Sequence, residues 1–141
     1  MNPSTPRHSV SVAAAVVRDD GRILAIRRRD NGKWEPPGGV LELDEGIHEG
    51  LVREVWEETG LHVEPGPLTG VYKNMERGIV ALVFRCRPAE GKALETAEAA
   101  QVRWLLPGEI EREMDEAYAV RMLDALRDGP PQVRAHNGPA E

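Results

Sequence analysis

The chain has 141 residues, of which 40% are hydrophobic and 30% are charged, with a formal net charge of −6 and an isoelectric point near 5.3. This length and composition are typical of one soluble globular domain, and the acidity argues against a nucleic-acid polymer as partner, because such binders need a basic face. The single cysteine, Cys86, excludes an internal disulfide and lies in an apolar run typical of a buried thiol. The longest apolar run, residues 12–17, is too short for a secretory signal or a membrane span, so we expect a cytoplasmic protein.

The first half of the chain predicts strands followed by one helix. The polar residues 1–9 are expected to be disordered, and the Val- and Ala-rich segment that follows predicts a buried strand. Asp20-Gly21 is a hairpin signal, which predicts that the next strand returns antiparallel to the first. The predicted elements are strands at 10–17, 22–29 and 40–43 and a helix at 46–59.

The second half predicts more strands and two short helices. Pro65-Gly66-Pro67 is expected to break one strand into two pieces, and Pro107 suits the first turn of a helix. The Pro- and Gly-rich residues 129–141 are expected to be a disordered tail, whose deletion would leave activity and melting temperature nearly unchanged. The predicted elements are strands at 61–63, 68–73, 79–87 and 100–106, a loop at 88–96, and helices at 107–113 and 115–127. The order predicts an α+β fold with one domain at 10–128.

The central helix carries three carboxylates on one face. Because a helix turns by about 100° per residue, Glu54, Glu57 and Glu58 share one side, while apolar side chains form a separate arc. Like charges at this spacing repel, although ion pairs of Arg53 with Glu49 and Glu57 can offset part of the cost. Clustered carboxylates are suitable ligands for a hard cation such as Mg²⁺. A solvated helix face is the alternative for a generic Glu-rich helix.

The residues around this helix have a recognisable spacing. Residues 38–61 read GGVLELDEGIHEGLVREVWEETGL. From Gly39 to Leu61 they resemble the box of the Nudix hydrolases, GX5EX7REUXEEXGU with U aliphatic, at every specified position. The resemblance implies an α/β/α sandwich with a mixed sheet between helices.

The resemblance also implies a metal site on the helix. Glu57 and Glu58 would be metal ligands, Glu54 a ligand or the general base, and Arg53 would orient the carboxylates. The carbonyl of Gly38 is a further candidate ligand. The implied cofactor is Mg²⁺, with Mn²⁺ as a possible substitute.

Other site residues lie outside the box helix. Arg27, at the end of a strand, is the candidate for contact with phosphate, and Glu45 is expected to position the helix or bind near the substrate. Glu98 is a candidate catalytic carboxylate from the loop before the last strand, with Glu95 as the neighbouring alternative. A solvated loop carboxylate is an equal alternative for Glu98.

By resemblance, the reaction is hydrolysis of a phosphoanhydride in a nucleoside diphosphate linked to another group. The leading substrate is a nucleoside triphosphate, modified or not, which gives a nucleoside monophosphate and pyrophosphate. ADP-ribose or a nucleotide sugar is the alternative, and a non-catalytic nucleotide sensor is an alternative of another class. The small members often read the base from the last helix, where Asp115, Glu116 and Tyr118 are available. We expect a small nucleotide as partner and a monomer or a homodimer.

Overall fold

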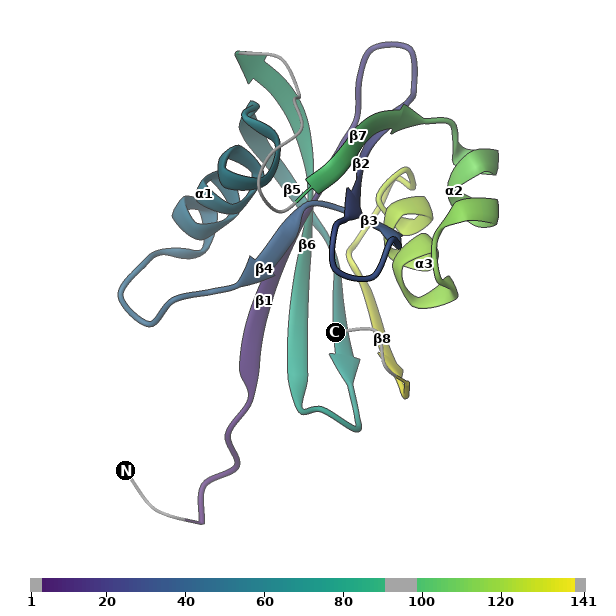
Figure 1. Cartoon of the computed structure of the whole chain (residues 1–141). Helices are drawn as coiled ribbons and strands as arrows, with labels where there is room; N and C mark the ends of the chain where they lie inside the picture. The colour runs from purple at the N-terminus through teal and green to yellow at the C-terminus, as the bar shows by residue number, and fades with distance from the viewer. Residues whose placement is uncertain (1–3, 91–98, 139–141) are drawn as a thin grey trace.

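The computed structural model describes residues 4–90 and 99–138 (Figure 1). Its helices are α1 (Ile47–Thr59), α2 (Pro107–Glu113) and α3 (Glu116–Asp124). Its strands are β1 (Ser9–Val16), β2 (Ile23–Arg28), β3 (Trp34–Glu35), β4 (Gly38–Val40), β5 (His62–Asn74), β6 (Ile79–Glu90), β7 (Ala99–Leu105) and β8 (Gln132–His136).

The strands form two sheets. The larger is mixed, with the order β4-β1-β6-β5-β8, and its β1–β6 and β5–β8 pairs are parallel. The smaller is antiparallel, with the order β3-β2-β7. Helix α1 lies on one side of the larger sheet, and α2 and α3 lie on the other (Figure 1). The predicted α+β class and α/β/α sandwich are confirmed.

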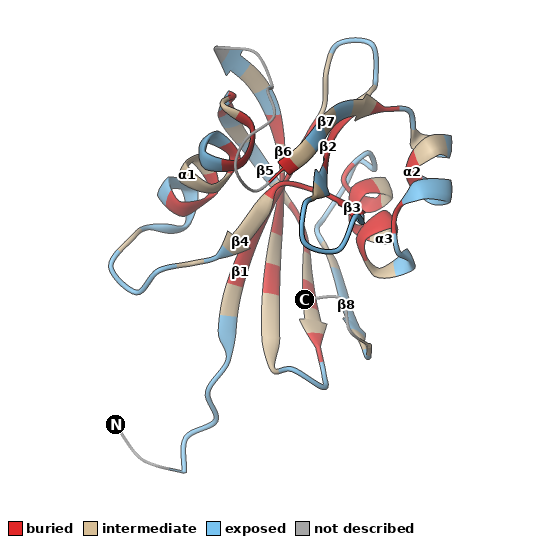
Figure 2. Cartoon of the chain, in the orientation of Figure 1, coloured by how far each residue is buried: buried red, intermediate tan, exposed pale blue. Residues whose placement is uncertain are grey.

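Each face of the larger sheet has its own apolar core. Leu51 and Val55 of α1 pack with Val12, Val16 and other residues on one side. On the other side, Ile110 of α2 and Met122 of α3 pack against strand residues of the larger sheet. These strand residues include Ala13, Ala15, Tyr72 and Ala81. Buried residues therefore gather along β1 and on the inner faces of the helices (Figure 2). Covering β1 on both faces explains why its sequence is apolar without alternation.

The predicted hairpin after the first strand forms only at its turn. In this turn the Arg18 amide donates to the Arg22 carbonyl at 2.9 Å. The two strands then make one antiparallel bridge, between Val17 and Ile23, and diverge. Strand β1 enters the larger sheet, where it pairs with β4 and β6, and β2 enters the smaller one, where it pairs with β3 and β7.

Further strand boundaries differ from the prediction: β6 runs to Glu90, into the expected loop, and β4 and β5 also depart from it. Strand β4 ends at Val40, because the Glu45 carboxylate accepts the amide of Glu42 at 2.9 Å and bends the chain after Leu41 into a loop. Strand β5 passes through the Pro-Gly-Pro segment without a break. Its register against β6 shifts between Pro65 and Leu68, so a bulge accommodates the prolines.

The expectation of a disordered tail at 129–141 is also wrong for its described part. Residues Gln132–His136 form β8, which pairs in parallel with β5 at the edge of the larger sheet. The amide of Met75 donates to the His136 carbonyl at 2.8 Å, and the Asn74 side chain donates to the Gly138 carbonyl at 3.1 Å. Within the described residues, no helix is both long and apolar enough to cross a membrane.

Candidate active site

Helix α1 is fixed at both ends by local contacts. The side chain of Glu49 accepts the amide of Gly46, which precedes the first turn, at 2.9 Å. Glu49 therefore caps the helix instead of pairing with Arg53 as the spacing suggested. At the other end, Gly60 adopts φ = 73°, the left-handed conformation that favours glycine. These contacts fix where α1 begins and ends.

Arg53 gathers the carboxylates of the acidic face. Its Nε and Nη2 donate to the two oxygens of Glu45 at 2.8 and 2.7 Å. Its Nη1 contacts Glu54 at 3.0 Å and Glu57 at 3.2 Å, the second being the i, i+4 pair expected from the sequence. One guanidinium thus meets three carboxylates, and an excess of negative charge is left on this side of α1.

Glu45 is held as an ionised, positioned group. Hydrogen bonds from Arg53 and from the amide of Glu42 lower its pKa to about 2. Its side chain is 8% exposed, and it lines neither of the two main cavities. The contacts match the expected positioning role and give no support to direct substrate binding.

The two glycines before the helix lie against its carboxylates. The amide of Gly38 donates to the carboxylate of Glu58 at 2.7 Å, and Glu58 is only 3% exposed. A Cβ on Gly39 would stand 2.6 Å from an oxygen of Glu54, so any larger residue at this position would force the Glu54 carboxylate to move. Glycine here lets β4 approach α1, and brings the backbone next to Glu54 and Glu58.

The donor set of this face fits a divalent cation. Carboxylate and carbonyl oxygens are the ligands that Mg²⁺ and Mn²⁺ prefer. Glu54 and Glu57 both reach one nitrogen of Arg53, so their oxygens converge at a point that already attracts positive charge. Within residues 4–90 and 99–138, however, no three acidic, His or Cys side chains stand close enough to form a complete metal cluster. The candidate Glu98, like its alternative Glu95, lies outside the described residues.

A cavity of about 230 Å³ opens beside the two glycines. Its floor is the α3-facing side of β1, and Tyr118 from α3 forms part of its wall. Its polar lining includes Ser11, Arg28 and Glu35, and its apolar lining includes Ala13, Pro36, Val40 and Ile79. Of the three residues proposed to read the base, Tyr118 lies here, whereas Asp115 and Glu116 line another cavity.

Arg28, rather than the predicted Arg27, reaches the cavity. Arg28 contacts Glu35 at 3.2 Å and holds Asp30 through two bonds of 2.8 Å. Arg27 instead donates to the carbonyl of Gly32 at 3.0 Å and to Gln101 at 3.4 Å, and it lines neither main cavity. Arg28 therefore lines this cavity and Arg27 does not, while the contact of Arg27 with phosphate stays a prediction.

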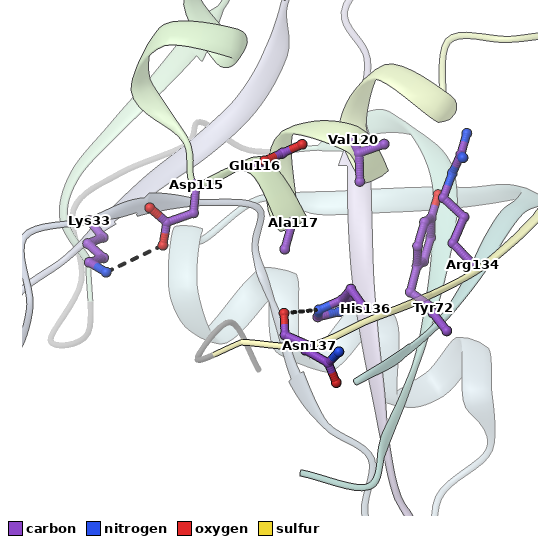
Figure 3. A pocket seen from close by; sticks show the side chains of 10 residues that line it. Lys33, Tyr72, Asp115, Glu116, Ala117, Val120, Arg134, His136 and Asn137 are labelled. Atoms are coloured by element: carbon purple, nitrogen blue, oxygen red, sulfur yellow. Dashed lines mark hydrogen bonds and ion pairs between the residues drawn. The ribbon is translucent and has the colours of Figure 1, made fainter. Parts of the chain in front are cut away.

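A larger cavity, of about 610 Å³, lies between α3 and β8 (Figure 3). Lys33 and Asp115 face each other at 3.4 Å on one side of it, and Tyr72 and Arg134 lie on the other. The two cavities share strand β3 and its flank: Lys33 lines the larger one and Glu35 the smaller one.

A buried network holds the wall of the larger cavity together. Asp124 accepts the Tyr72 hydroxyl at 2.8 Å and two bonds from Arg134 at 2.8 and 2.9 Å. Burial by itself raises the pKa of Asp124, but the bonds from Arg134 and Tyr72 outweigh it and hold this pKa below its ordinary value. Burial also raises the pKa of the Tyr72 hydroxyl, which keeps it a hydrogen-bond donor.

Cys86 is a packing residue, as its position in an apolar strand predicted. It is 1% exposed, and burial raises its thiol pKa to about 12. A thiol that stays protonated is a poor nucleophile, so Cys86 has no place in the site.

Three cavity residues were missed by sequence reasoning. Arg28 belongs to the run Arg27-Arg28-Arg29, which the sequence offered for phosphate contact, but no alternation from Ile23 to Ile26 indicates which of the three faces the cavity. Glu35 lies in the segment Trp-Glu-Pro-Pro-Gly-Gly, in which Gly38 was the candidate for a role in the site. Ser11 could have been noticed as the one hydroxyl inside an otherwise apolar run of β1, from Val10 to Val16.

The comparisons with known proteins agree with this geometry. The family model for the NUDIX domain matches residues 7–126. A MutT-like protein of Streptomyces ambofaciens is 62% identical over 135 residues, which cover 96% of this chain and 88% of that protein. An ADP-ribose pyrophosphatase of Methanocaldococcus jannaschii is 34% identical over 84 residues, 55% of this chain and 50% of that protein. A NUDIX hydrolase structure from Nitrosomonas europaea superimposes with a TM-score of 0.82 at 22% identity, covering 95% of this chain and 81% of that one.

A mixed sheet between helices, with an acidic helix following a Gly-Gly strand, defines the class of enzyme. The chain belongs to the Nudix family and is a Nudix hydrolase. Members of this family act on small nucleotide substrates and generally use a divalent metal ion.

Proposed function

We propose that this chain hydrolyses a nucleoside triphosphate, or a modified one, to a nucleoside monophosphate and pyrophosphate, with Mg²⁺ as cofactor and Mn²⁺ as a substitute. One observation carries the proposal: the acidic face of α1 adjoins, through Gly38 and Gly39, a cavity that contains one arginine and one aromatic wall. The carboxylate face suits the metal-bound phosphates, and the cavity suits a single base.

The carboxylates of α1 and Arg53 have separate roles in the proposed metal site. Glu57, Glu58 and the carbonyl of Gly38 would hold the cation, together with Glu54 or with Glu54 left to act as general base. When bound, the cation neutralises phosphate oxygens and acidifies water. Arg53 keeps Glu54 and Glu57 in place through charge-assisted hydrogen bonds, and Glu45 anchors Arg53.

Arg28 and a general base complete the scheme. Arg28 would exchange part of its contact with Asp30, which is exposed, for a phosphate oxygen. Glu54 would take the proton of the attacking water, since its carboxylate borders Gly39 at the cavity end of the face. Glu98 is the alternative general base.

The larger cavity favours a second candidate function. A substrate such as ADP-ribose or a nucleotide sugar carries a bulky group beyond its diphosphate, and the cavity of about 610 Å³ between α3 and β8 adjoins the smaller one across β3. The similarity to an ADP-ribose pyrophosphatase is consistent with this reading.

One screen separates the two candidates. The purified protein, with and without Mg²⁺, is incubated with nucleoside triphosphates, modified deoxynucleotides, ADP-ribose, nucleotide sugars and dinucleoside polyphosphates, and the products are identified by mass. Metal-dependent release of a monophosphate and pyrophosphate from one triphosphate supports the proposal. Preference for ADP-ribose or a nucleotide sugar replaces it with the second candidate.

We further propose that the enzyme works in the cytoplasm on free nucleotides, as a monomer or homodimer. The net charge of −6 disfavours a nucleic-acid polymer as substrate. The single buried thiol is consistent with a reducing compartment.

A further inference from the structure

The hydroxyl of Ser11 is a buried polar group without an explanation in the fold. Ser11 is 3% exposed, and its Oγ has no hydrogen-bond partner within residues 4–90 and 99–138. Buried hydroxyls are nearly always paired, because leaving one unpaired is costly. Alanine at this position would avoid the cost, so the hydroxyl calls for a partner outside the described residues, and a bound ligand can supply it.

Ser11 lines the smaller cavity, so a partner for its hydroxyl would lie there. Residues 11 and 13 of a strand share a face, and Ala13 packs on the α3 side of the sheet. Ser11 therefore faces the same side as Tyr118 and lines the cavity with it. Its neighbours across the sheet, Val40 and Ala81, have apolar side chains that cannot accept the hydrogen bond.

The chemistry of the cavity favours a ring over a phosphate at this point. Ser11 is neutral, and the surrounding wall includes Val40, Ile79 and Tyr118, which offer apolar and aromatic surface. A phosphate would be drawn to Arg28 and to the metal-binding face instead. A neutral hydroxyl surrounded by apolar side chains can select a flat ring by a hydrogen bond to one polar group on its edge.

We propose that Ser11 is a specificity-determining residue, whose hydroxyl hydrogen-bonds to a polar substituent on the nucleobase of the substrate. This inference rests on the proposed function and names what the site selects. A site that supplies such a bond rejects a base lacking the substituent, because the hydroxyl then stays buried and unpaired.

The test combines Ser11→Ala with base analogues. kcat/KM is measured for the preferred triphosphate and for analogues that each lack one ring substituent; for guanine these are the hypoxanthine and 2-aminopurine nucleotides. For the wild type, we expect kcat/KM to be about tenfold lower with one analogue than with the parent nucleotide. For Ser11→Ala, we expect kcat/KM with the parent nucleotide to fall about tenfold, with no further decrease when that analogue replaces the parent. Ribose and deoxyribose pairs are included, and a loss of discrimination confined to the sugar would overturn the assignment to the base.

Two further readouts separate recognition from structure. Removing an unpaired buried hydroxyl should leave the melting temperature of ligand-free Ser11→Ala equal to that of the wild type or slightly above it. Thr69→Val is the matched control: it removes a buried hydroxyl that donates to the Val83 carbonyl at 3.1 Å, so it should lower stability without changing base preference. An equal effect of Ser11→Ala on every nucleotide, or no effect on any, would contradict the proposal.

Calorimetric binding of nucleoside monophosphates without metal makes the test independent of turnover. If no triphosphate is hydrolysed, the proposed function fails, but weaker binding of one monophosphate to Ser11→Ala would still support the inference. If triphosphates are hydrolysed and the variant binds every monophosphate as the wild type does, only the inference fails. Absence of binding by the wild type to any monophosphate would overturn it as well.

Discussion

A cluster of charged side chains lies on each side of the central sheet, and the two differ in range and in balance. On α1, Arg53 contacts Glu45, Glu54 and Glu57, which lie one to eight residues away. On the other side, Asp124 is bonded by Tyr72, 52 residues away, and by Arg134, ten residues away. The first cluster is local in sequence, and the second joins α3, β5 and β8.

The difference in charge separates the proposed metal site from a cluster that stabilises the fold. Three carboxylates share the Arg53 guanidinium, and Glu58 beside them takes a backbone amide, so the α1 cluster carries excess negative charge. Asp124 receives a bidentate arginine and a hydroxyl, so the second cluster is compensated within the fold. A cluster in which three carboxylates share one guanidinium suits the binding of a further cation.

The largest effect should follow from Glu57→Gln. Glu57 is 46% exposed, so the change should leave the fold intact while it removes one ligand charge. We expect kcat to fall by at least about a hundredfold. Glu64→Gln, which removes an exposed carboxylate near Arg87, is the control and should keep full activity. Near-normal turnover of Glu57→Gln with Mg²⁺ would refute the site.

Deleting residues 129–141 should strongly destabilise the protein, in contrast to the expectation from sequence. The deletion removes β8 and with it the arginine that holds Asp124. We expect the melting temperature to fall by roughly 5 °C or more. Scanning calorimetry of the full and truncated chains checks this, and an unchanged melting temperature would mean that β8 contributes nothing to stability.

Asp124→Asn isolates the compensated cluster with a single change. Asp124 is 4% exposed, and the loss of its charge-assisted bonds should cost about 2 kcal/mol of unfolding free energy. Tyr72→Phe, which removes one hydroxyl of the same cluster, should cost about 1 kcal/mol. Urea denaturation of the two variants and of the double variant measures the coupling, and strictly additive losses would show that the two groups do not act together.

The same cluster predicts a small pH dependence. Because the pKa of Asp124 is lowered below 3.8 in the fold, its contribution is complete above pH 3.8 and is lost as the pH falls through the folded pKa. The stability difference between wild type and Asp124→Asn should therefore be constant from neutral pH to about pH 5 and shrink only in more acidic solution. A difference that disappears already near pH 6 would require a raised pKa and contradict the assignment.

The same contrast explains what the sequence could predict. The carboxylates of α1 share a face because of helical spacing within one element, and Gly60 ends that element by its own conformation, so both were predictable locally. Strand β8 was not, because its segment is bracketed by Gly129, Pro130, Pro131 and Gly138, and it is stabilised by bonds to α3 and β5. Arg28 was missed for a related reason: the register of β2 against β7 shifts between Arg27 and Arg28, which no alternation pattern reveals.

The most direct test of the central claim is metal binding to the two clusters. Calorimetric titration with Mn²⁺ is carried out on the wild type, on Glu57→Gln and on Asp124→Asn, at a temperature at which all three are folded. We predict that Asp124→Asn binds the ion as the wild type does, whereas Glu57→Gln binds it at least about tenfold more weakly. Equal affinity of the wild type and Glu57→Gln would contradict the claim that the carboxylates of α1 form the metal site.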